Sequence, residues 1–451
     1  MSRGAPYTAD FVAEALALDA GSEAFSAIQT DTRSILPGAL FVALTGERFD
    51  GHDFLAAARD AGARAAVVRR GTAAVPGLRL LEVSDPLEAW GDLARARRRR
   101  IAGPVIAITG QNGKTSTKEM VAAVVATRFR TWRTRANNNN RIGVPLTILE
   151  APLDTEALVV EAGANLPGEI AQYRAIIEPD IAIVTNAGSG HLEGFGDVAG
   201  VVREKLSLTR DVPRVITGVV PADLADGARA RGAVMVTTAG LAAADQVPDR
   251  VEMTADGCPR VTVDGHTFRL TARGRHQAGN AMFAWSVARH LALDLAAAAA
   301  ALEQFALPGG RGELSQHGDL TILNDGYNAN PESFAAAIAL ASELRAGRRL
   351  IFVAGTMKEL GAHEASLHDA VTESLMGLAP ELLVLVGEFV PAFARVGAGY
   401  AGDVLTAPTA AEAGTLLAPR VTGRELLVLK GSRGAALEQL LPAILSRSPL
   451  D

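Results

Sequence analysis

The segment that most constrains the fold is Ile108–Ser116, which reads Ile-Thr-Gly-Gln-Asn-Gly-Lys-Thr-Ser. It follows an apolar run from Pro104 to Ile108 and opens into a helical pattern, which predicts a strand, a glycine loop and a helix in that order. In such a loop the backbone N–H groups and the positive end of the helix face phosphates. The segment therefore predicts an α/β sheet that holds a triphosphate, with ATP as the expected nucleotide.

The loop also predicts roles for single residues. Lys114 is expected to reach the β and γ oxygens, and the Thr115 hydroxyl is expected to bind Mg²⁺. The remaining predicted nucleotide-binding residues of the loop are Gly110, Asn112, Gly113 and Ser116. Ile108 stands where the general pattern has its first glycine, so only the shorter form T-G-x-x-G-K-T is present.

Lysine is scarce in this chain. Of 44 basic residues, the lysines are Lys114, Lys118, Lys205, Lys358 and Lys430, and all the others are arginines. An amine is a compact charge that can lose its proton and react, which a guanidinium does not. Each lysine is therefore a candidate functional residue. Some of them, Lys118 above all, are nevertheless expected to have no special role.

Composition limits the class of protein. A length of 451 residues suggests two to four domains, and a net charge of −6 argues against a broad nucleic-acid surface. Cys258 is the one cysteine, which excludes an intramolecular disulfide. No signal segment and no apolar run of about 18 residues is recognisable. We expect a cytoplasmic protein without a membrane span, a monomer, with small molecules as partners.

The order of apolar and helical patterns predicts an α/β protein of three domains, residues 1–101, 102–308 and 309–451. Arg97 to Arg100, at the end of the helix expected from Pro86, are interpreted as a solvated helix end or linker. In the second domain, strand candidates alternate with helices, which favours a mostly parallel sheet. Val251–Thr271 is expected to be antiparallel. The alternation restarts after the turn at Leu307–Gly310, and the strands expected there are Leu320–Asn324, Leu350–Ala354, Leu382–Val386 and Glu425–Leu429.

Ligands of open α/β sheets gather beyond the carboxyl ends of strands. Glu161 ends one expected strand, and Asn186 and His191 follow the next. A carboxylate and an imidazole beside the Thr115 hydroxyl would suit Mg²⁺, which keeps several waters. A glutamate at a strand end is structural about as often as functional, whereas His191 lies in a glycine-rich segment with little structural need for imidazole.

Two asparagine-rich segments leave alternatives open. Asn137–Asn140 offers amides for a sugar or peptide ligand, or forms a turn in which the amides bind the backbone. In the segment Asn324–Pro331, Asp325 suits a ribose hydroxyl. Asn330 precedes Pro331 and is a natural helix N-cap, and both roles can hold together.

These motifs, in this order and spacing, resemble the Mur ligase family, the ATP-dependent enzymes that form the amide bonds of the peptidoglycan stem peptide. The resemblance covers nearly the whole chain and is strongest to the member that adds D-alanyl-D-alanine. It is carried by Thr30–Arg33, Leu40–His52, the phosphate loop, Asn137–Pro145, Glu161–Asn165, Asn186–Gly196, Gly274–Asn280, Tyr327–Pro331 and Leu429–Gly434.

The resemblance implies an N-terminal α/β domain for the UDP substrate, a central ATP-binding domain and a C-terminal Rossmann-like domain for the dipeptide. It implies UDP contacts from Asp31, Thr32, Arg33, Gly46, Arg48 and His52. Asn138 and Asn139 would face UDP-N-acetylmuramoyl-tripeptide, and Asn280, Arg311 and Asp325 would contact ATP. Tyr327, Asn328 and Asn330 would place D-alanyl-D-alanine. Thr115, Glu161, His191 and Lys205 would hold Mg²⁺, two ions in all.

Lys205 matches the family lysine that CO₂ converts to a carbamate, which needs a neutral amine. The family often continues Lys-Gly-Glu, whereas this chain has Lys205-Leu206-Ser207. Many members carry acids in place of Thr356 and Lys358, and Lys358 receives no role here. Lys114, His191 and Lys205 are the residues that the resemblance implies for catalysis.

The implied reaction converts the tripeptide carboxylate into an acyl phosphate, which the dipeptide amine then attacks. Two alternatives remain beside it. Another ligase of the superfamily would add a single amino acid, or glutamate to folate, but Tyr327–Pro331 favours the dipeptide. A phosphate-loop kinase or nucleotide-gated binding module would explain Lys114 but not the asparagine run, Lys205 and the last-domain motif together.

Overall fold

The computed structural model describes residues 7–46, 49–236 and 244–446. The chain divides into two compact units, each made of several segments. The first contains residues 1–107, 129–164 and 169–181, and the second contains residues 108–128, 165–168 and 182–451.

The first unit begins with a small parallel sheet in the order β1-β2-β3-β4. Its strands are Ile28–Gln29, Leu40–Val42, Ala65–Arg69 and Arg79–Val83. Helix α1 is Ala9–Leu16, and α2 is Leu55–Asp60. Buried residues of β2, β3 and α2, among them Phe41, Val68 and Leu55, form one apolar cluster. This packing explains why the short apolar runs of the first hundred residues become strands.

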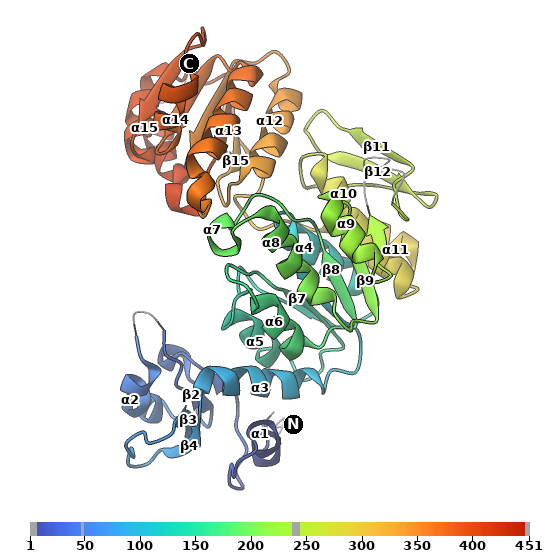
Figure 1. The fold of residues 1–451 in the computed structure, drawn as a ribbon, viewed down its shortest axis with the longest axis vertical. Coiled ribbons are helices and arrows are strands. Elements are labelled where there is room, and N and C mark those ends of the chain that lie inside the picture. The colour runs from blue at the N-terminus through green and yellow to red at the C-terminus, as the bar shows by residue number, and fades with distance from the viewer. Residues whose placement is uncertain (1–6, 47–48, 237–243, 447–451) are drawn as a thin grey trace. The chain divides into compact units, whose positions relative to one another are not determined.

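Helix α3 (Pro86–Arg98) is a central element of the first unit (Figure 1). Asp85 caps it and Pro86 is its first residue. The Trp90 indole donates to the Ile142 carbonyl oxygen at 3.1 Å. Arg97 is buried and donates to the Pro152 carbonyl oxygen at 2.8 Å, and Arg98 binds the Asp180 carboxylate at 3.0 Å. The interpretation of Arg97–Arg100 as a solvated run is therefore wrong for its first two residues.

A six-stranded sheet has the order β10-β9-β8-β5-β7-β6. In chain order its strands are Val105–Thr109, Thr131–Arg133, Ala157–Glu161, Ile181–Val184, Arg214–Gly218 and Val234–Val236. The helices between them are α4 (Lys114–Val125), α5 (Gly143–Leu149), α6 (Glu169–Ile177), α7 (Leu192–Phe195), α8 (Val198–Leu206) and α9 (Ala222–Arg229). The four longer strands are almost entirely buried, as expected for strands covered on both faces.

A three-stranded antiparallel sheet follows in the second unit, as the irregular pattern of Val251–Thr271 predicts. Its strands are β11 (Arg250–Met253), β12 (Pro259–Val263) and β13 (His266–Arg269). Helix α10 (His276–His290) is buried along most of its length and packs on α4. Helix α11 (Leu295–Gln304) contains a run of alanines and also packs on α4.

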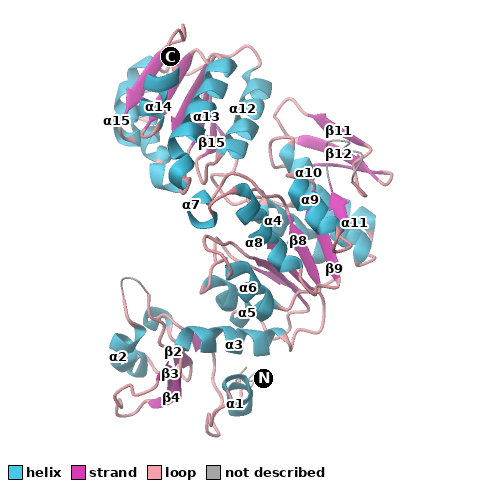
Figure 2. Ribbon diagram, viewed as in Figure 1, coloured by secondary structure: helices cyan, strands magenta, loops and turns pink. Residues whose placement is uncertain are grey.

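The C-terminal sheet has the order β14-β15-β19-β16-β17-β18 and is parallel except for β14. Its strands are Glu313–His317, Leu320–Asp325, Leu350–Gly355, Leu382–Val386, Val404–Ala407 and Leu426–Lys430. Helices α12 (Pro331–Arg345), α13 (Glu364–Leu378) and α14 (Phe389–Val396) share an apolar cluster with one face. Helices α15 (Ala410–Leu417) and α16 (Leu441–Leu445) share one with the other face. Figure 2 shows strands of this sheet in magenta beside helices α12, α13, α14 and α15 in cyan.

The α/β class and the mostly parallel sheets are confirmed, and the C-terminal sheet has the three layers of a Rossmann-like arrangement. The expected strands agree with the observed ones to within one or two residues. The domain boundaries near residues 101 and 308 stay predictions. Across the described ranges, no helix combines the length and the hydropathy needed to cross a bilayer.

Candidate active site

The predicted phosphate loop lies between β5 and α4. Gly110 has φ +145°, and a side chain there would lie 2.0 Å from Thr185 Oγ1. Gly113 has φ +78° and precedes the first residue of α4. Both positions require glycine, because the backbone is left-handed or closely approached. The Lys114 ammonium donates to the Gly110 and Gln111 carbonyl oxygens at 2.9 and 3.0 Å. The lysine thus folds back over its own loop, where a phosphate would lie.

The segment after β8 frames the other side of the loop. The Gln111 N–H donates to the Asn186 carbonyl oxygen at 3.0 Å, and the Asn112 N–H donates to Asn186 Oδ1 at 2.8 Å. Asn186 Nδ2 and Thr185 Oγ1 both donate to the Asn112 carbonyl oxygen. These bonds fix the loop conformation, so Asn186, singled out as a strand-end residue, orients the loop.

The start of α10 closes the loop from behind. A side chain at Gly113 would lie 2.4 Å from Asn280 Oδ1, and Thr117 Oγ1 donates to the same oxygen at 3.4 Å. Asn280 in turn donates to Gln277 Oε1. Thr115 and Ser116 are buried in the first turn of α4. The predicted nucleotide-binding residues of the loop and Asn280 are therefore brought together.

His191 contacts a carboxylate that the sequence did not predict. Its Nδ1 atom lies directly against Oε2 of Glu359, in the segment after β16. The imidazole holds the pKa of the Glu359 carboxyl below its ordinary value, despite the opposing effect of partial burial. The signal that could have identified Glu359 is its place after a strand of the second parallel sheet.

Lys205 is fully buried near the end of α8, and its ammonium lies 5.5 Å from the centre of the Phe195 ring. Lys118 and Lys430 are fully buried as well, and Lys358 is exposed. Lys118, which is expected to have no special role, is completely buried on α4 and forms an ion pair with Glu119 at 2.8 Å, and its role stays a prediction.

In the first unit, the asparagine run has the predicted turn role and also contacts a predicted metal ligand, and its role toward a sugar or peptide ligand stays a prediction. Asn139 Nδ2 donates to Glu161 Oε1 at 2.8 Å, so this amide orients the predicted metal ligand. Asn140 Oδ1 accepts from the N–H groups of Ile142 and Gly143, which is the turn role. The Asn138 backbone lies against Gly143, where a side chain would approach within 2.4 Å.

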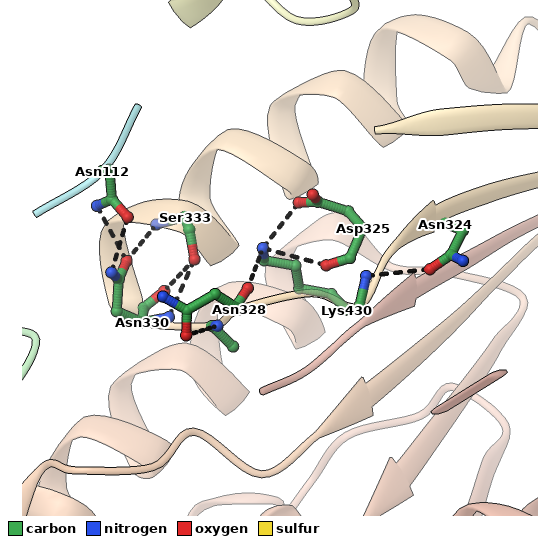
Figure 3. Close-up of polar contacts among 9 residues, drawn as sticks. Asn112, Asn324, Asp325, Asn328, Asn330, Ser333 and Lys430 are labelled. Carbon is green, nitrogen blue, oxygen red and sulfur yellow. Dashed lines mark hydrogen bonds and ion pairs between the residues drawn. The ribbon is translucent and has the colours of Figure 1, made fainter. Parts of the chain in front are cut away.

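The loop before α12 reaches the phosphate loop through a pair of amides (Figure 3). Asn330 Nδ2 donates to Asn112 Oδ1 at 2.8 Å, and Asn112 Nδ2 donates to Asn330 Oδ1 at 3.1 Å. Asn330 also caps α12 in a capping box with Ser333, which confirms the predicted N-cap before Pro331. Two residues after Asn330, Glu332 Oε1 accepts from the Ser189 N–H at 2.8 Å.

Lys430 anchors the same loop (Figure 3). It ends β19, and its ammonium donates to Asp325 Oδ2 at 2.7 Å, to the Asn328 carbonyl oxygen at 2.8 Å and to the Asp325 carbonyl oxygen at 3.3 Å. The Asp325 carboxylate, which is predicted to bind ribose, therefore forms an ion pair with Lys430. Lys430 is one of the few lysines of this chain, and the sequence alone predicts no role for it.

Two other predicted residues of this region contact each other. The Arg311 guanidinium lies 4.1 Å from the centre of the Tyr327 ring, in a cation–π arrangement. The Tyr327 N–H donates to the Gly310 carbonyl oxygen at 3.3 Å. A residue predicted for ATP thus stacks on one predicted for the dipeptide.

The predicted UDP residues form two local clusters in the first unit. Arg33 binds Asp31 through two nitrogens, and these bonds lower the pKa of the Asp31 carboxyl to about 2. Thr32 begins the short helical turn Thr32–Ser34, and Asp31 caps this turn. His52 Nδ1 contacts Asp50 Oδ1 at 2.6 Å, and its Nε2 accepts from the Arg69 N–H. Both ring nitrogens of His52 are thus engaged.

Gly46 lies beside this second cluster, where a side chain would approach the Phe49 ring within 3.0 Å. Arg48 lies outside the described residues. The UDP contacts of both clusters stay predictions.

The donor set suits Mg²⁺ bound largely by water and phosphate. Among the described residues, no three His, Cys, Asp or Glu side chains form a group that could hold a metal. Thr115 offers a hydroxyl oxygen, and the Nδ1 contact with Glu359 leaves His191 Nε2 as the ring nitrogen for a ligand. Mg²⁺ in nucleotide sites commonly takes one or two protein ligands together with phosphate oxygens and waters.

Comparison with known proteins places three family domains in this chain. Residues 24–98 match the catalytic domain of the Mur ligase family, residues 108–288 match the Mur ligase middle domain, and residues 310–433 match the Mur ligase glutamate ligase domain. The chain is 34% identical over 435 residues to the UDP-N-acetylmuramoyl-tripeptide--D-alanyl-D-alanine ligase of Escherichia coli, and the match covers 93% of each chain.

Solved structures of similar proteins superpose on nearly the whole of this chain. A crystal structure of MurF from Acinetobacter baumannii is 29% identical and superposes with a TM-score of 0.88, covering 98% of this chain and 99% of the other. The MurF ligase of Thermotoga maritima in complex with ADP is 26% identical with a TM-score of 0.82, covering 93% and 97%.

Proposed function

Because the chain belongs to the Mur ligase family, we propose that it joins D-alanyl-D-alanine to UDP-N-acetylmuramoyl-tripeptide with the cleavage of ATP. The reaction serves the synthesis of peptidoglycan precursors in the cytoplasm. The observation that carries the proposal is the match along nearly the whole chain to a ligase of that name. The phosphate loop with Lys114 supports the use of ATP, as does the likeness to an ADP-bound relative.

The reaction needs an activated carboxylate, because a free carboxylate is a poor acyl donor. The terminal carboxylate of the tripeptide attacks the γ-phosphorus of ATP, which gives an acyl phosphate and ADP. The dipeptide amine then attacks the acyl carbon, and the tetrahedral intermediate collapses to the amide and releases phosphate. The share of the protein is to position the reactants and to neutralise the charge of the γ-phosphoryl group.

Lys114 performs the second task. In the free loop its ammonium binds the Gly110 and Gln111 carbonyl oxygens. A triphosphate offers stronger, charged acceptors at the same place, so the ammonium exchanges carbonyl oxygens for phosphate oxygens. The residues proposed to contact the rest of the nucleotide are Asn280, Arg311 and Asp325.

We propose Thr115, Glu161 and His191 as the side chains that hold Mg²⁺, with Lys205 as a carbamate beside a second ion. Bound Mg²⁺ neutralises phosphate charge and fixes the γ-phosphoryl group. The proposal for Lys205 rests on its match to the family lysine, and the side chain is buried near the end of α8. The chain departs from the usual family sequence directly after this lysine.

The substrate residues follow the same proposal. Asp31, Thr32, Arg33, Gly46, Arg48 and His52 serve the UDP group, and Asn138 and Asn139 serve the muramoyl-peptide. Tyr327, Asn328 and Asn330 serve the dipeptide. We propose a monomer, which size-exclusion chromatography with light scattering tests.

Incubation with ATP, UDP-N-acetylmuramoyl-tripeptide and D-alanyl-D-alanine tests the function. Amide product with one phosphate for each bond formed supports the ligase. Replacing the dipeptide by single amino acids, or the UDP substrate by folate, tests the other ligases of the superfamily. Phosphate release that does not depend on the dipeptide would identify a nucleotide hydrolase and refute the proposal.

A further inference from the structure

We propose that Glu359 is a positioning residue for the metal site. Its carboxylate lies against Nδ1 of His191 and orients the ring so that Nε2 faces the metal. The inference rests on the proposed function, in which His191 is a ligand of Mg²⁺, and adds to it a residue that neither the motifs nor the relatives assign.

The contact joins two segments that are far apart in the sequence. His191 precedes α7, after β8, and Glu359 follows β16 of the C-terminal sheet. Besides the contact between His191 Nδ1 and Glu359 Oε2, the Glu193 N–H donates to the Glu359 carbonyl oxygen at 3.3 Å. The side chains are 19% and 48% exposed, so the pair lies at the edge of the site, open to ligands.

Both partners adopt backbone conformations that their residue types disfavour. His191 has φ +59° and Glu359 has φ +64°, in the left-handed region where glycine is at ease. Nine other non-glycine residues of the described chain also have positive φ, and six of them are alanines, so this conformation alone does not mark a functional site. At His191 and Glu359 it coincides with the contact between the two side chains.

The segment that carries Glu359 is held by hydrogen bonds of the two residues that precede it. The Met357 N–H donates to Nε2 of the buried His368 at 3.0 Å, and the Lys358 N–H donates to Ser432 Oγ at 3.1 Å. His368 Nδ1 contacts the Glu364 carbonyl oxygen at 2.8 Å, which fixes its tautomer. A carboxylate on so well anchored a segment can orient its partner.

A carboxylate on one ring nitrogen of a metal-binding histidine has a known physical effect. It fixes the tautomer and the ring orientation and makes the other nitrogen a better ligand. Because Glu359 belongs to the C-terminal segment, the metal site gains its full affinity only while that segment meets the loop after β8. An ion pair without this role would leave metal binding unchanged when it is removed.

Three variants separate the possibilities. Glu359→Gly removes the carboxylate and relieves the backbone, so it should keep the thermal unfolding midpoint. Glu359→Gln removes the charge and keeps an acceptor. Glu373→Gln, an exposed site on α13, is the matched control for the change in charge.

The first readout is the affinity for Mn²⁺ in the presence of ADP, followed by the electron paramagnetic resonance of the free ion. We expect Glu359→Gly to bind Mn²⁺ at least about tenfold more weakly than wild type, which is the lower end of the range for residues that orient a metal ligand. The affinity of Glu359→Gln should lie between those of Glu359→Gly and wild type. The affinity of Glu373→Gln should equal that of wild type. The second readout is the long-range ¹H–¹⁵N spectrum of the histidine rings, assigned with His191→Ala. Nδ1 of His191 should carry the proton in wild type, and the two tautomers should mix in Glu359→Gly.

Less than a tenfold loss of Mn²⁺ affinity in Glu359→Gly, or an unchanged tautomer, overturns the inference while the ligase assignment stands. If His191→Ala binds Mn²⁺ as wild type does, the metal role of His191 fails and the inference fails with it. Amide formation in the wild-type enzyme is scored separately, so failure of the proposed function is distinguishable from both results.

Discussion

Replacement of Lys430 by methionine should loosen the segment Asp325–Asn330, which carries a residue proposed to contact ATP and the residues proposed to place the dipeptide. Methionine fills a similar volume, so the packing around β19 stays nearly intact. What disappears is the ammonium, which is 3% exposed and binds three oxygens of that segment. The perturbation therefore removes polar anchoring without opening a cavity.

The expected magnitude follows from the three bonds. Each of the two short bonds is made by a charged donor and contributes about 1.5–3 kcal/mol, and the bond at 3.3 Å adds little. Their sum, about 3–6 kcal/mol, is an upper limit, because the Asp325 side chain is 28% exposed and regains water when the lysine is gone. We expect a loss of about 2–4 kcal/mol, which corresponds to local opening that is about 30-fold to 700-fold more frequent.

Native-state hydrogen exchange of peptides that cover residues 320–330 and 426–432 measures this opening directly. The KM for the dipeptide and the KM for ATP should both rise in the same variant, because the segment carries residues proposed for each substrate. In the double variant Lys430→Met with Asp325→Asn, the loss should be smaller than the sum of the single losses, because the uncompensated carboxylate is removed. A change of less than about fivefold in the exchange of these peptides would refute the reasoning that Lys430 anchors the segment.

Three further predictions concern other parts of the molecule. Lys114→Ala should abolish ADP formation, with a barrier increase of at least about 3 kcal/mol, and near-normal turnover in a quenched-flow assay would contradict the role of the loop. Gly113→Ala should weaken ADP binding at least about tenfold in calorimetry, because it combines left-handed strain with a clash against Asn280, whereas Gly347→Ala, at φ +79° in open space, meets only the strain and should bind ADP normally. Burial alone raises the pKa of the Glu425 carboxyl, but hydrogen bonds from Thr422 and Gly423 outweigh it and hold the pKa below its ordinary value. The ionised Glu425 carboxylate therefore stabilises the fold fully at pH 7, and this stabilisation is lost as the pH falls below about 4.5. The difference in unfolding midpoint between wild type and Glu425→Gln should shrink in acid. A difference that stays constant with pH would contradict this.

Much of the fold was predictable because its strands are buried on both faces. A run such as Leu382–Val386 has no polar position, which marks a central parallel strand and little else. The phosphate loop was predictable because its glycines meet a local need: Gly110 and Gly113 have backbone conformations that side chains disfavour. In both cases the information lies within a few consecutive residues.

The contacts across the site were not predictable in this way. Arg97 looks like the start of a solvated run, because its carbonyl partners lie more than 50 residues away and bear no recognisable sequence mark. Lys430 gains its partners only when β19 lies beside β15 in one sheet, and Glu359 gains its partner only when the segment after β16 meets the segment after β8 of another sheet. The scarcity of lysine pointed to Lys430, because a chain that uses arginine elsewhere has lysine where a compact ammonium fits among three oxygens.

Three polar contacts reach the phosphate loop region from the C-terminal segment. Asn330 pairs with Asn112, Glu332 accepts from Ser189, and Glu359 lies against His191. Each exchanges a bond to water for a bond to protein, so its net free energy is small. Such contacts form and break readily, unlike an apolar interface of the same extent. They place an amide at the phosphate loop and a carboxylate at the predicted metal ligand, so the same segment that carries the proposed dipeptide residues touches both parts of the nucleotide site. Binding of the dipeptide and of the metal nucleotide should therefore strengthen each other, since both favour the state in which these contacts are made.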